Sequence, residues 1–372
     1  MVNNMKYSPS LRTFLLAASL GAFACAAGNG VPAYQIDASW PGVLPNNWAM
    51  GQVGGLAMGA QDHLFVIHRP KSVGKDQLMA GTNPPGAECC VVAPPVIEFD
   101  RNGKVVRAWG GPGAGYEWFT SEHGIYVDGK GNVWVSGVAG KDYGRILKFT
   151  NEGKFLLQIG DNLPAGQAFN NNLTNVFGRQ PADMYVDLKT NELFVADGDG
   201  GASRMIVFDS ETGKFKRLWG AYGEKPGPFP APAHDPKGPP SKFFSSAVHC
   251  VVEGVDGLLY VCDRNGDRIQ LFKKDGTYVK EKIVAATSMG GGTAFDVDFT
   301  TDHKIMFLVD GANQKVRLFQ RDTLEEVGSF GHQGQSAGQF RNAHSIAVDS
   351  KNNVYISETG EGKRVQKFVP RK

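Results

Sequence analysis

Three histidines occupy the same place in a repeated sequence phrase, and together they could bind a metal ion. His123 precedes GIYVDGKGNVWVSG, His249 precedes CVVEGVDGLLYVCD, and His344 precedes SIAVDSKNNVYISE. Three histidines with a fourth position left open are the ligand set of a catalytic zinc site, and imidazole also suits copper, nickel or iron. One histidine at the start of a strand is more often structural. The metal prediction therefore depends on all three sharing one position.

The phrase that carries these histidines predicts short β-strands. Each copy has two strands joined by a short turn, a third strand of the RIQLF type and a fourth strand after another turn. Residues 247–281 are the clearest copy, with Asp275-Gly276 as a hairpin turn. Six copies fit this template, and the sixth lacks its last strand. Residues 34–40, YQIDASW, could supply it.

The sequence therefore predicts an all-β fold, a six-bladed β-propeller closed by an N-terminal strand. A right-handed β-helix is the alternative, but its repeats are shorter and lack hairpin turns. The equivalent first-strand positions are predicted to be Gly54, His123, Ala182, His249, Thr293 and His344. The histidines then belong to alternate blades and should converge on the central axis.

The long connections are predicted to lie on the same rim as these positions. They are residues 70–95, 111–122, 161–180 and 221–246, whereas the turns within hairpins are short. Insertions are tolerated on any surface, but tolerance alone does not place them all on one rim. Long loops on a rigid scaffold commonly carry function.

Residues 1–27 are predicted to be a secretory signal peptide, and residues 34–372 the propeller. Lys6 and Arg12 precede the apolar run FLLAASLGAFACAA, which is too short for a spanning helix. We expect an exported protein, periplasmic or secreted, without a membrane span and monomeric. Lipidation at Cys25 is the alternative, and Ala22 and Phe23 make a poor lipoprotein signal. A formal net charge of +2 gives no reason to expect a nucleic-acid partner.

Four cysteines follow the predicted signal peptide, and an even number in an exported chain suggests disulfides. Cys250 and Cys262 lie on two strands of one hairpin, about equally far from its turn, so a bridge between the strands is predicted. Cys89 and Cys90 could form a bridge between neighbours or stay reduced.

The repeat resembles the NHL family, whose blades read much like VDxxGNVYVADxxNxRIQKF. The phrases around His123, His249 and His344 resemble those of peptidyl-α-hydroxyglycine α-amidating lyases, and GQVGGLAM…LFVIHRP resembles the first blade of these enzymes. The resemblance covers nearly the whole mature chain. It implies a six-bladed propeller, zinc on the three histidines, an active-site arginine at Arg69, and cleavage of an α-hydroxyglycine-extended peptide into a peptide amide and glyoxylate.

The chain departs from that family at two positions. Asp199 stands where the resemblance places a catalytic tyrosine, in ADGDGGASR, so Asp199 is one candidate base and Tyr143, on the same rim, is another. Tyr116 is a weaker candidate of the same kind. Ser345 stands where the family has an acidic residue that helps hold a structural calcium, which puts calcium in doubt. Asp263, Arg264, Asp310 and Glu358 end second strands, and we expect most of them to bond between blades.

Three functions are compatible with these patterns. The first is an exported metal-dependent carbon–nitrogen lyase acting on a small or peptidyl carbinolamide. The second is a non-catalytic NHL propeller that binds a peptide or protein through its loop-rich rim. The third is a hydrolase of the lactonase kind, but those enzymes use carboxylate and amide ligands for calcium, and the first-strand positions offer imidazoles.

Overall fold

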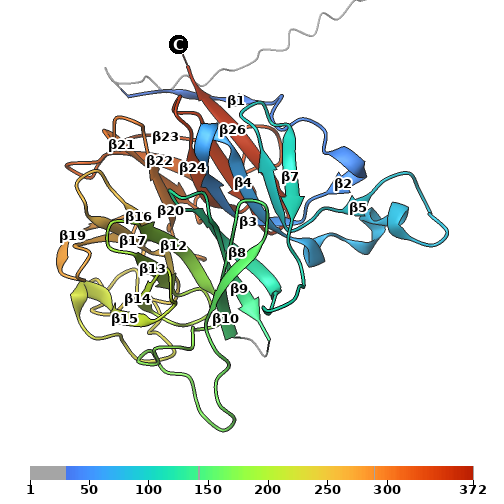
Figure 1. The fold of residues 1–372 in the computed structure, drawn as a ribbon. Coiled ribbons are helices and arrows are strands. Elements are labelled where there is room, and N and C mark those ends of the chain that lie inside the picture. The colour runs from blue at the N-terminus through green and yellow to red at the C-terminus, as the bar shows by residue number, and fades with distance from the viewer. Residues whose placement is uncertain (1–30, 141–142, 289, 372) are drawn as a thin grey trace, which may run out of the picture.

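Six four-stranded antiparallel sheets are arranged around a central axis, which confirms the predicted six-bladed propeller (Figure 1). The structure is a computed structural model and describes residues 31–140, 143–288 and 290–371. The predicted signal peptide lies outside the described residues.

Each blade is one sheet, and in blades one to five its strands follow the chain in order from first to last. Blades one to three are formed by β3 (Gln52–Met58), β4 (Leu64–Arg69), β6 (Val96–Phe99) and β7 (Val105–Trp109); β8 (Phe119–Val127), β9 (Val133–Ala139), β10 (Tyr143–Phe149) and β11 (Phe155–Ile159); and β12 (Pro181–Asp187), β13 (Glu192–Asp197), β14 (Arg204–Asp209) and β15 (Phe215–Trp219).

The second half of the ring repeats the pattern. Blades four to six are formed by β16 (Val248–Glu253), β17 (Leu259–Asp263), β18 (Arg268–Phe272) and β19 (Tyr278–Ile283); β20 (Ala294–Phe299), β21 (Ile305–Asp310), β22 (Lys315–Gln320) and β23 (Glu325–Phe330); and β24 (Ala343–Val348), β25 (Val354–Glu358), β26 (Arg364–Pro370) and β1 (Tyr34–Asp37).

The N-terminal strand closes the ring, as the sequence predicts. β1 pairs antiparallel with β26, from Tyr34 opposite Pro370 to Asp37 opposite Lys367. β1 is the outermost strand of the sixth sheet, so segments from both ends of the chain complete this blade and hold the ring closed. Figure 1 shows the blue β1 beside the red β26.

The hydrophobic core lies between neighbouring blades. One cluster, for example, joins Leu271 of β18 to Leu308 of β21, and another joins Phe194 of β13 to Leu259 of β17. Strands that are buried on both faces in this way hold the turns and loops at their ends in fixed positions.

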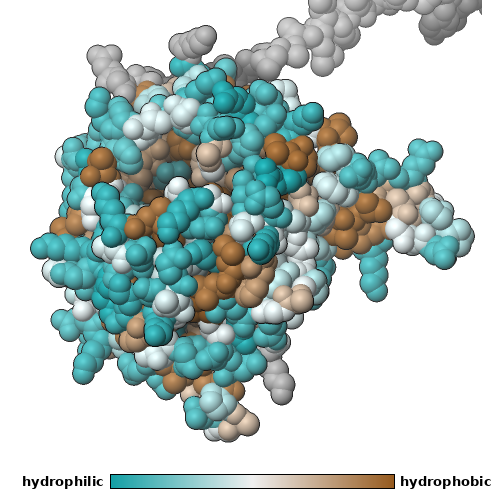
Figure 2. Space-filling model, viewed as in Figure 1, coloured by the Kyte–Doolittle hydropathy of each residue, from teal (hydrophilic) through white to brown (hydrophobic). Residues whose placement is uncertain are grey.

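One long connection projects from the ring. It runs from residue 70 to residue 95 between β4 and β6, and β5 (Val91–Val92) within it pairs with β2 (Trp48–Ala49). Figure 2 shows hydrophobic side chains gathered beside this projection, on a face that is mostly hydrophilic.

The short 3-10 helices are η1 (Pro45–Asn47), η2 (Ala60–Asp62), η3 (Pro70–Ser72), η4 (Lys75–Gln77), η5 (Met79–Gly81), η6 (Ala221–Gly223) and η7 (Arg264–Gly266).

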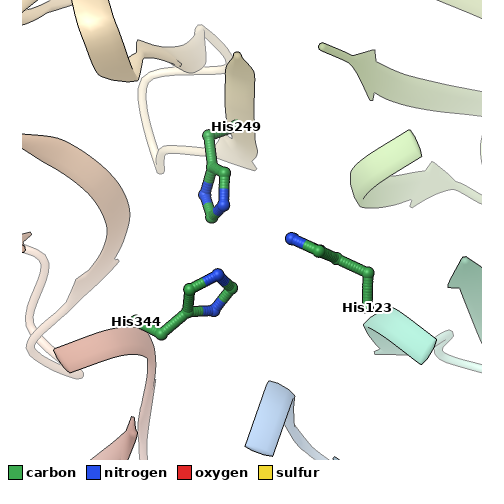
Figure 3. Close-up of side chains that lie close together, drawn as sticks. All are labelled: His123, His249 and His344. Carbon is green, nitrogen blue, oxygen red and sulfur yellow. The ribbon is translucent and has the colours of Figure 1, made fainter. Parts of the chain in front are cut away.

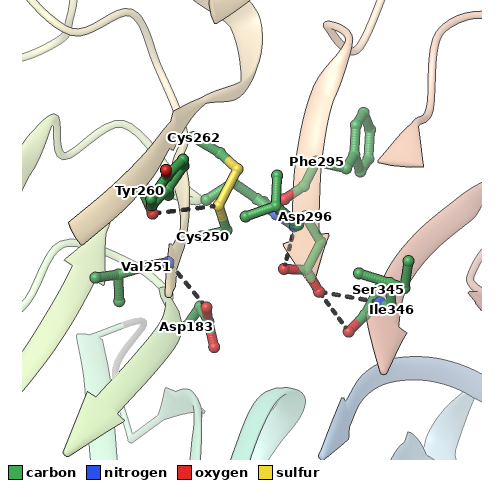
Figure 4. The surroundings of a disulfide bond; sticks show 11 residues. Asp183, Cys250, Val251, Tyr260, Cys262, Phe295, Asp296, Ser345 and Ile346 are labelled. Atoms are coloured by element: carbon green, nitrogen blue, oxygen red, sulfur yellow. Dashed lines mark hydrogen bonds between the residues drawn. A yellow bond between two sulfur atoms is a disulfide. The ribbon is translucent and has the colours of Figure 1, made fainter. Parts of the chain in front are cut away.

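Both pairs of cysteines are bridged. Cys250 and Cys262 are opposite each other in the β16–β17 pairing, which confirms the predicted cross-strand disulfide (Figure 4). Cys89 and Cys90 also form a disulfide, which settles the alternative that the sequence left open.

Acidic residues at the ends of second strands bond mainly within their own blade. Asp263 binds Arg268 of the next strand at 2.8 Å and Asp310 binds Arg317 at 2.7 Å. Asp263 also accepts a hydrogen bond from the Ser245 N–H, which belongs to the link that enters the blade. The expectation of bonds between blades was therefore wrong for these residues, because the arginine at the start of the third strand is the nearest cation.

Candidate metal centre and its surroundings

His123, His249 and His344 come together at the axis of the propeller. Figure 3 shows their rings pointing into one space from β8, β16 and β24. One nitrogen from each ring lies within 4.8 Å of the other two, and all three side chains are buried. Among the described residues, this is the one group of three or more histidines, cysteines or carboxylates with its ligand atoms gathered in this way.

A β-bulge in the first strand of each blade presents these side chains. The extra residue is Gly54, Ala182, His249 and Phe295 in blades one, three, four and five, and the pairs His123-Gly124 and His344-Ser345 face one residue in blades two and six. A bulge bends the strand and re-aims a side chain. In blades two and six the N–H that the bulge frees donates to a serine of the second strand: Gly124 to Ser136 and Ser345 to Ser357.

The position predicted for blade five was two residues too early. Thr293 precedes β20, and its N–H donates to Asp267, whereas Phe295 is the bulged residue. Asp298 has the spacing of the Asp that follows the first strand in the other copies, but pairing with β21 puts Thr300 in that place. Phe295 packs against His249 and His344, with ring centroids 5.3 and 5.7 Å apart.

Two of the histidines have a fixed tautomer. His123 Nδ1 donates to the carbonyl of Ala182 at 3.0 Å, and His249 Nδ1 donates to the carbonyl of Phe295 at 2.7 Å. Each carbonyl belongs to the bulged residue of the next blade. A carbonyl can only accept, so Nδ1 carries the proton and the lone pair is on Nε2.

These nitrogens suit a metal ion. His123 Nε2, His249 Nε2 and His344 Nδ1 are buried and have no hydrogen-bond partner among the described residues. Burial, with help from neighbouring cations, holds the pKa of His249 and of His344 well below its ordinary value. Neutral imidazoles with free lone pairs are the donors that zinc requires, so the residues fit this metal.

Small residues leave space beside the three rings. A cavity of about 20 Å³ lies against the histidines, Gly54 and Ala182, enough for one water-sized group. A side chain at Gly54 would meet the His123 carbonyl oxygen at 2.7 Å. A larger residue at this position would therefore push on the strand that carries a candidate ligand.

Asp199 lies at the edge of the histidine cluster. Its Oδ2 is 3.0 Å from His123 Nε2, without the direction of a hydrogen bond, and its Oδ1 is 3.3 Å from Arg264 Nη2. Burial by itself would raise the pKa of Asp199, but His123, Arg264 and His249 together lower it well below its ordinary value. The carboxylate is therefore ionised and paired.

Arg264 bonds between blades, as the sequence analysis expected for most of these strand ends, but it does so beside the histidines, where no site role was predicted for it. Its guanidinium reaches Asp199 and lies 4.9 Å from the centre of the Phe295 ring. The sequence could have revealed this role. Arg264 comes directly after the second strand of blade four, and Arg69 ends the second strand of blade one. Val53 pairs with His68 and Val248 pairs with Asp263, so the two arginines are equivalent.

Arg69 is held beside the same centre. Its Nε donates to the carbonyl of Glu122, the residue before His123, at 2.8 Å, and its Nη1 donates to Gln52 at 2.9 Å. Burial lowers the pKa of Arg69, and the charge of Asp199 partly offsets this effect. Arg69 and Arg264 therefore approach Asp199 from opposite blades.

Both tyrosines predicted near the site belong to blade two or to the link that precedes it. Tyr143 begins β10, opposite Ala139. Tyr116 packs among Trp118, Phe149 and Phe155, and its hydroxyl donates to the Gly111 carbonyl. Tyr116 is thus a packing residue, and Tyr143 stays a prediction.

The channel behind the histidines does not provide the calcium ligand that the resemblance implied. Ser345 replaces the acidic residue, and its hydroxyl donates to Asp296 Oδ2 at 2.8 Å, which also accepts from the Ile346 N–H (Figure 4). Asp183 accepts from the Val251 N–H. The position after His344 is neutral and lacks the acidic ligand that the resemblance implied, so calcium stays a prediction in doubt.

No protein-family model matches the chain. NHL repeat-containing protein 3 of Mus musculus is 28% identical over 288 residues, which cover 74% of this chain and 73% of that protein. Peptidyl-alpha-hydroxyglycine alpha-amidating lyase 1 of Drosophila melanogaster is 26% identical over 361 residues, covering 91% of this chain and 60% of that protein. Peptidyl-glycine alpha-amidating monooxygenase B of Xenopus laevis is 27% identical over 353 residues, covering 90% of this chain and 35% of that protein.

A solved structure of similar fold is a streptogramin B lyase. It covers 91% of this chain and 98% of its own, with a TM-score of 0.53 and 11% sequence identity. At this identity the likeness concerns the fold alone. The chain is a six-bladed β-propeller related in sequence to NHL repeat-containing proteins and to the amidating lyases.

Proposed function

We propose that this protein is a metal-dependent lyase that cleaves the C–N bond of a carbinolamide, with an α-hydroxyglycine-extended peptide as the model substrate. The observation that carries the proposal is the cluster of three buried imidazoles with unpartnered nitrogens, bordered by Arg69, Asp199 and Arg264. Relatives named as amidating lyases support the reaction class.

His123, His249 and His344 would hold zinc. When bound, zinc supplies a Lewis acid that makes the hydroxyl proton of the substrate easier to remove. The hydrogen bonds from Nδ1 of His123 and His249 to backbone carbonyls orient the two rings and make the imidazoles more basic.

Arg69 and Arg264 would bind the carboxylate end of the substrate. Guanidinium groups bind carboxylates through paired, charge-assisted hydrogen bonds. In the protein alone, Asp199 is the carboxylate that these arginines approach. Because both arginines already approach Asp199, they are in position before the substrate arrives. The substrate carboxylate would then compete with Asp199 for them.

The reaction needs a base for the hydroxyl proton and an acid for the leaving nitrogen. As the O–H proton leaves, the C–N bond breaks, and the amide nitrogen takes up a proton to give the peptide amide and glyoxylate. A base works best when its pKa lies near the working pH. The lowered pKa of Asp199 makes it a weak base, and Tyr143 is the other candidate from this chain.

A non-catalytic binding propeller is the second candidate function. Asp199 favours it, because a paired carboxylate stands where the resemblance places a catalytic tyrosine. The relation to NHL repeat-containing protein 3 extends over 73% of that protein. On this alternative, the loop-rich rim would bind a peptide or protein.

Export and a monomeric state belong to the same proposal. Disulfides at Cys89–Cys90 and Cys250–Cys262 suit an oxidising compartment, periplasmic or extracellular. None of the helices in the described part of the chain is long and apolar enough to cross a membrane. The substrate would be a small molecule or a peptide.

Glyoxylate release tests the function. The mature protein, loaded with zinc, is incubated with an α-hydroxyglycine-extended peptide, and glyoxylate and peptide amide are measured in equal amounts. Zinc bound in a 1:1 ratio without turnover would contradict the lyase and leave the metal centre standing. Absence of stoichiometric metal would favour the binding propeller.

A further inference from the structure

A second cavity lies on the loop-rich rim, where the links entering and leaving blade four meet. Its volume is about 380 Å³, within the range of small-ligand sites. Its wall includes His234 from the link before β16, Asn265 and Asp267 from the turn between β17 and β18, and Ser288 and Gly292 from the link before β20. Its volume and its lining distinguish it from the space beside the three histidines.

Two buried polar atoms in this wall have no hydrogen-bond partner among the described residues. They are Asp267 Oδ2 and Ser245 Oγ, and each residue is only 1% exposed. The other oxygen of Asp267 accepts from the Thr293 N–H at 2.9 Å, and the Ser245 N–H donates to Asp263. The scaffold therefore uses one polar group of each residue, and both residues line the cavity.

An unpaired buried carboxylate oxygen is unfavourable, so an occupant that donates hydrogen bonds would stabilise the site. The other ionisable groups near Asp267 are His234, whose Nε2 is 3.4 Å from Oδ2, and Asp310, which is paired with Arg317. Arg268, adjacent to Asp267 in sequence, pairs with Asp263 and Glu281, and Arg264 directs its guanidinium to Asp199. Burial raises the pKa of Asp267, and its Oδ2 has only the imidazole of His234 beside it among the described residues. An ammonium or guanidinium ion in the cavity would favour the charged carboxylate.

Two side chains, Asn265 and Arg264, connect the cavity to the histidine centre. Asn265 lines it, and the Asn265 side-chain oxygen accepts a hydrogen bond from Arg264 Nε at 3.2 Å. Arg264 in turn reaches Asp199, beside His123. A peptide whose carboxyl end lies at Arg264 could place a neighbouring side chain in this cavity.

We propose that the cavity around Asp267 and Ser245 is a subsite for a cationic side chain, lysine or arginine, of the peptide. The peptide part of this inference rests on the proposed lyase function, whereas binding of the cation rests on the cavity alone. Asp267 Oδ2 and Ser245 Oγ accept hydrogen bonds from the cation, and His234 borders it.

Binding is tested first, with calorimetry and two matched probes, Nα-acetyl-lysinamide and Nα-acetyl-norleucinamide. We expect the wild-type protein to bind the lysine probe at least tenfold more tightly than the neutral one. Asp267→Asn should remove this preference, because asparagine keeps the acceptor for Thr293 and tolerates the positive φ of 52° at this position but lacks the charge. Ser245→Ala should weaken binding of the lysine probe while the charge remains.

Asp235→Asn is the matched control, since it removes one negative charge from an exposed residue next to His234. This control should keep the wild-type preference. Equal binding of the two probes by the wild-type protein, or an unchanged preference in Asp267→Asn, would overturn the proposal.

Turnover separates this inference from the proposed function. We expect an α-hydroxyglycine peptide with lysine before the hydroxyglycine to have a KM about tenfold lower than its norleucine counterpart, and Asp267→Asn to equalise the two KM values at similar kcat. Turnover without any preference would overturn the subsite and leave the lyase standing. Binding of the lysine probe without turnover of either peptide would reject the lyase and retain the cation site.

Discussion

Arg69 and Arg264 occupy the same position in opposite blades of the ring, and both approach Asp199. Arg69 follows His68, and Arg264 follows Asp263. His68 and Asp263 each pair with the residue just before the bulge in the first strand of their blade. Arg264 Nη2 is 3.3 Å from Asp199 Oδ1, and Asp199 is the leading charge acting on Arg69. We propose that these two guanidinium groups bind an anionic group of the substrate.

Replacing Arg264 tests this binding site. Arg264→Ala should lower kcat/KM for an α-hydroxyglycine peptide by about 10- to 100-fold, because a charge-assisted hydrogen bond is lost. Steady-state glyoxylate release measures the effect. Arg341→Ala is the control, since Arg341 pairs with Glu361 at the surface. An unchanged kcat/KM in Arg264→Ala would show that the substrate carboxylate binds elsewhere.

The three histidines should bind one zinc ion together. Elemental analysis of the purified mature protein is expected to give about one metal ion per chain, and His123→Ala, His249→Ala and His344→Ala should each lose most of it, because two imidazoles bind zinc much more weakly than three. His332→Ala serves as control, since its Nδ1 lies at an exposed backbone carbonyl. Full zinc occupancy in all three variants would contradict the proposed ligand set.

Asp199 should limit the lyase reaction. If the missing tyrosine explains weak activity, Asp199→Tyr should raise the rate of glyoxylate release, because a phenol replaces a carboxylate of lowered pKa. Asp199→Phe has similar size without the hydroxyl and provides the control. Equal rates in the two variants would show that the hydroxyl supplies no proton transfer.

The bridge between Cys250 and Cys262 should stabilise the blade that carries His249. The two cysteines are 12 residues apart in sequence, and closing a loop of that length contributes about 3 kcal/mol in the chain-entropy treatment. We therefore expect the double variant Cys250→Ala, Cys262→Ala to unfold at a lower urea concentration. Adding a reductant should shift wild type toward the variant, and coincident urea curves without reductant would refute this role.

Glu192 should make stability depend on pH in the acid range. Hydrogen bonds from Arg217 lower the pKa of Glu192 to about 2, from an ordinary value of 4.5. A lowered folded-state pKa means that the stabilisation is complete above the unfolded pKa and disappears as pH falls toward 2.

Glu192→Gln should therefore unfold more easily than wild type at pH 7, by roughly 1–3 kcal/mol. The difference should shrink as pH falls below 4.5 and vanish near pH 2. Urea unfolding followed at several pH values measures it. A difference that stays constant with pH would point to packing as its cause.

The sequence predicted the ring, its closure and the positions of the three histidines, because these follow from the periodic repeat. A four-stranded unit that recurs six times has one compact solution, and β1 was the one strand available to complete blade six. The bridge between Cys250 and Cys262 followed from the same hairpin register.

The tertiary structure decided how side chains meet across blades. Phe295, and not Thr293, is the blade-five residue at the axis, because pairing with β21 sets the bulge. Asp199 and Arg264 come from neighbouring blades and meet only when blades three and four pack together. Repeat periodicity fixes the path of the backbone, whereas contacts between loops of different blades depend on the direction of each side chain, which periodicity does not encode.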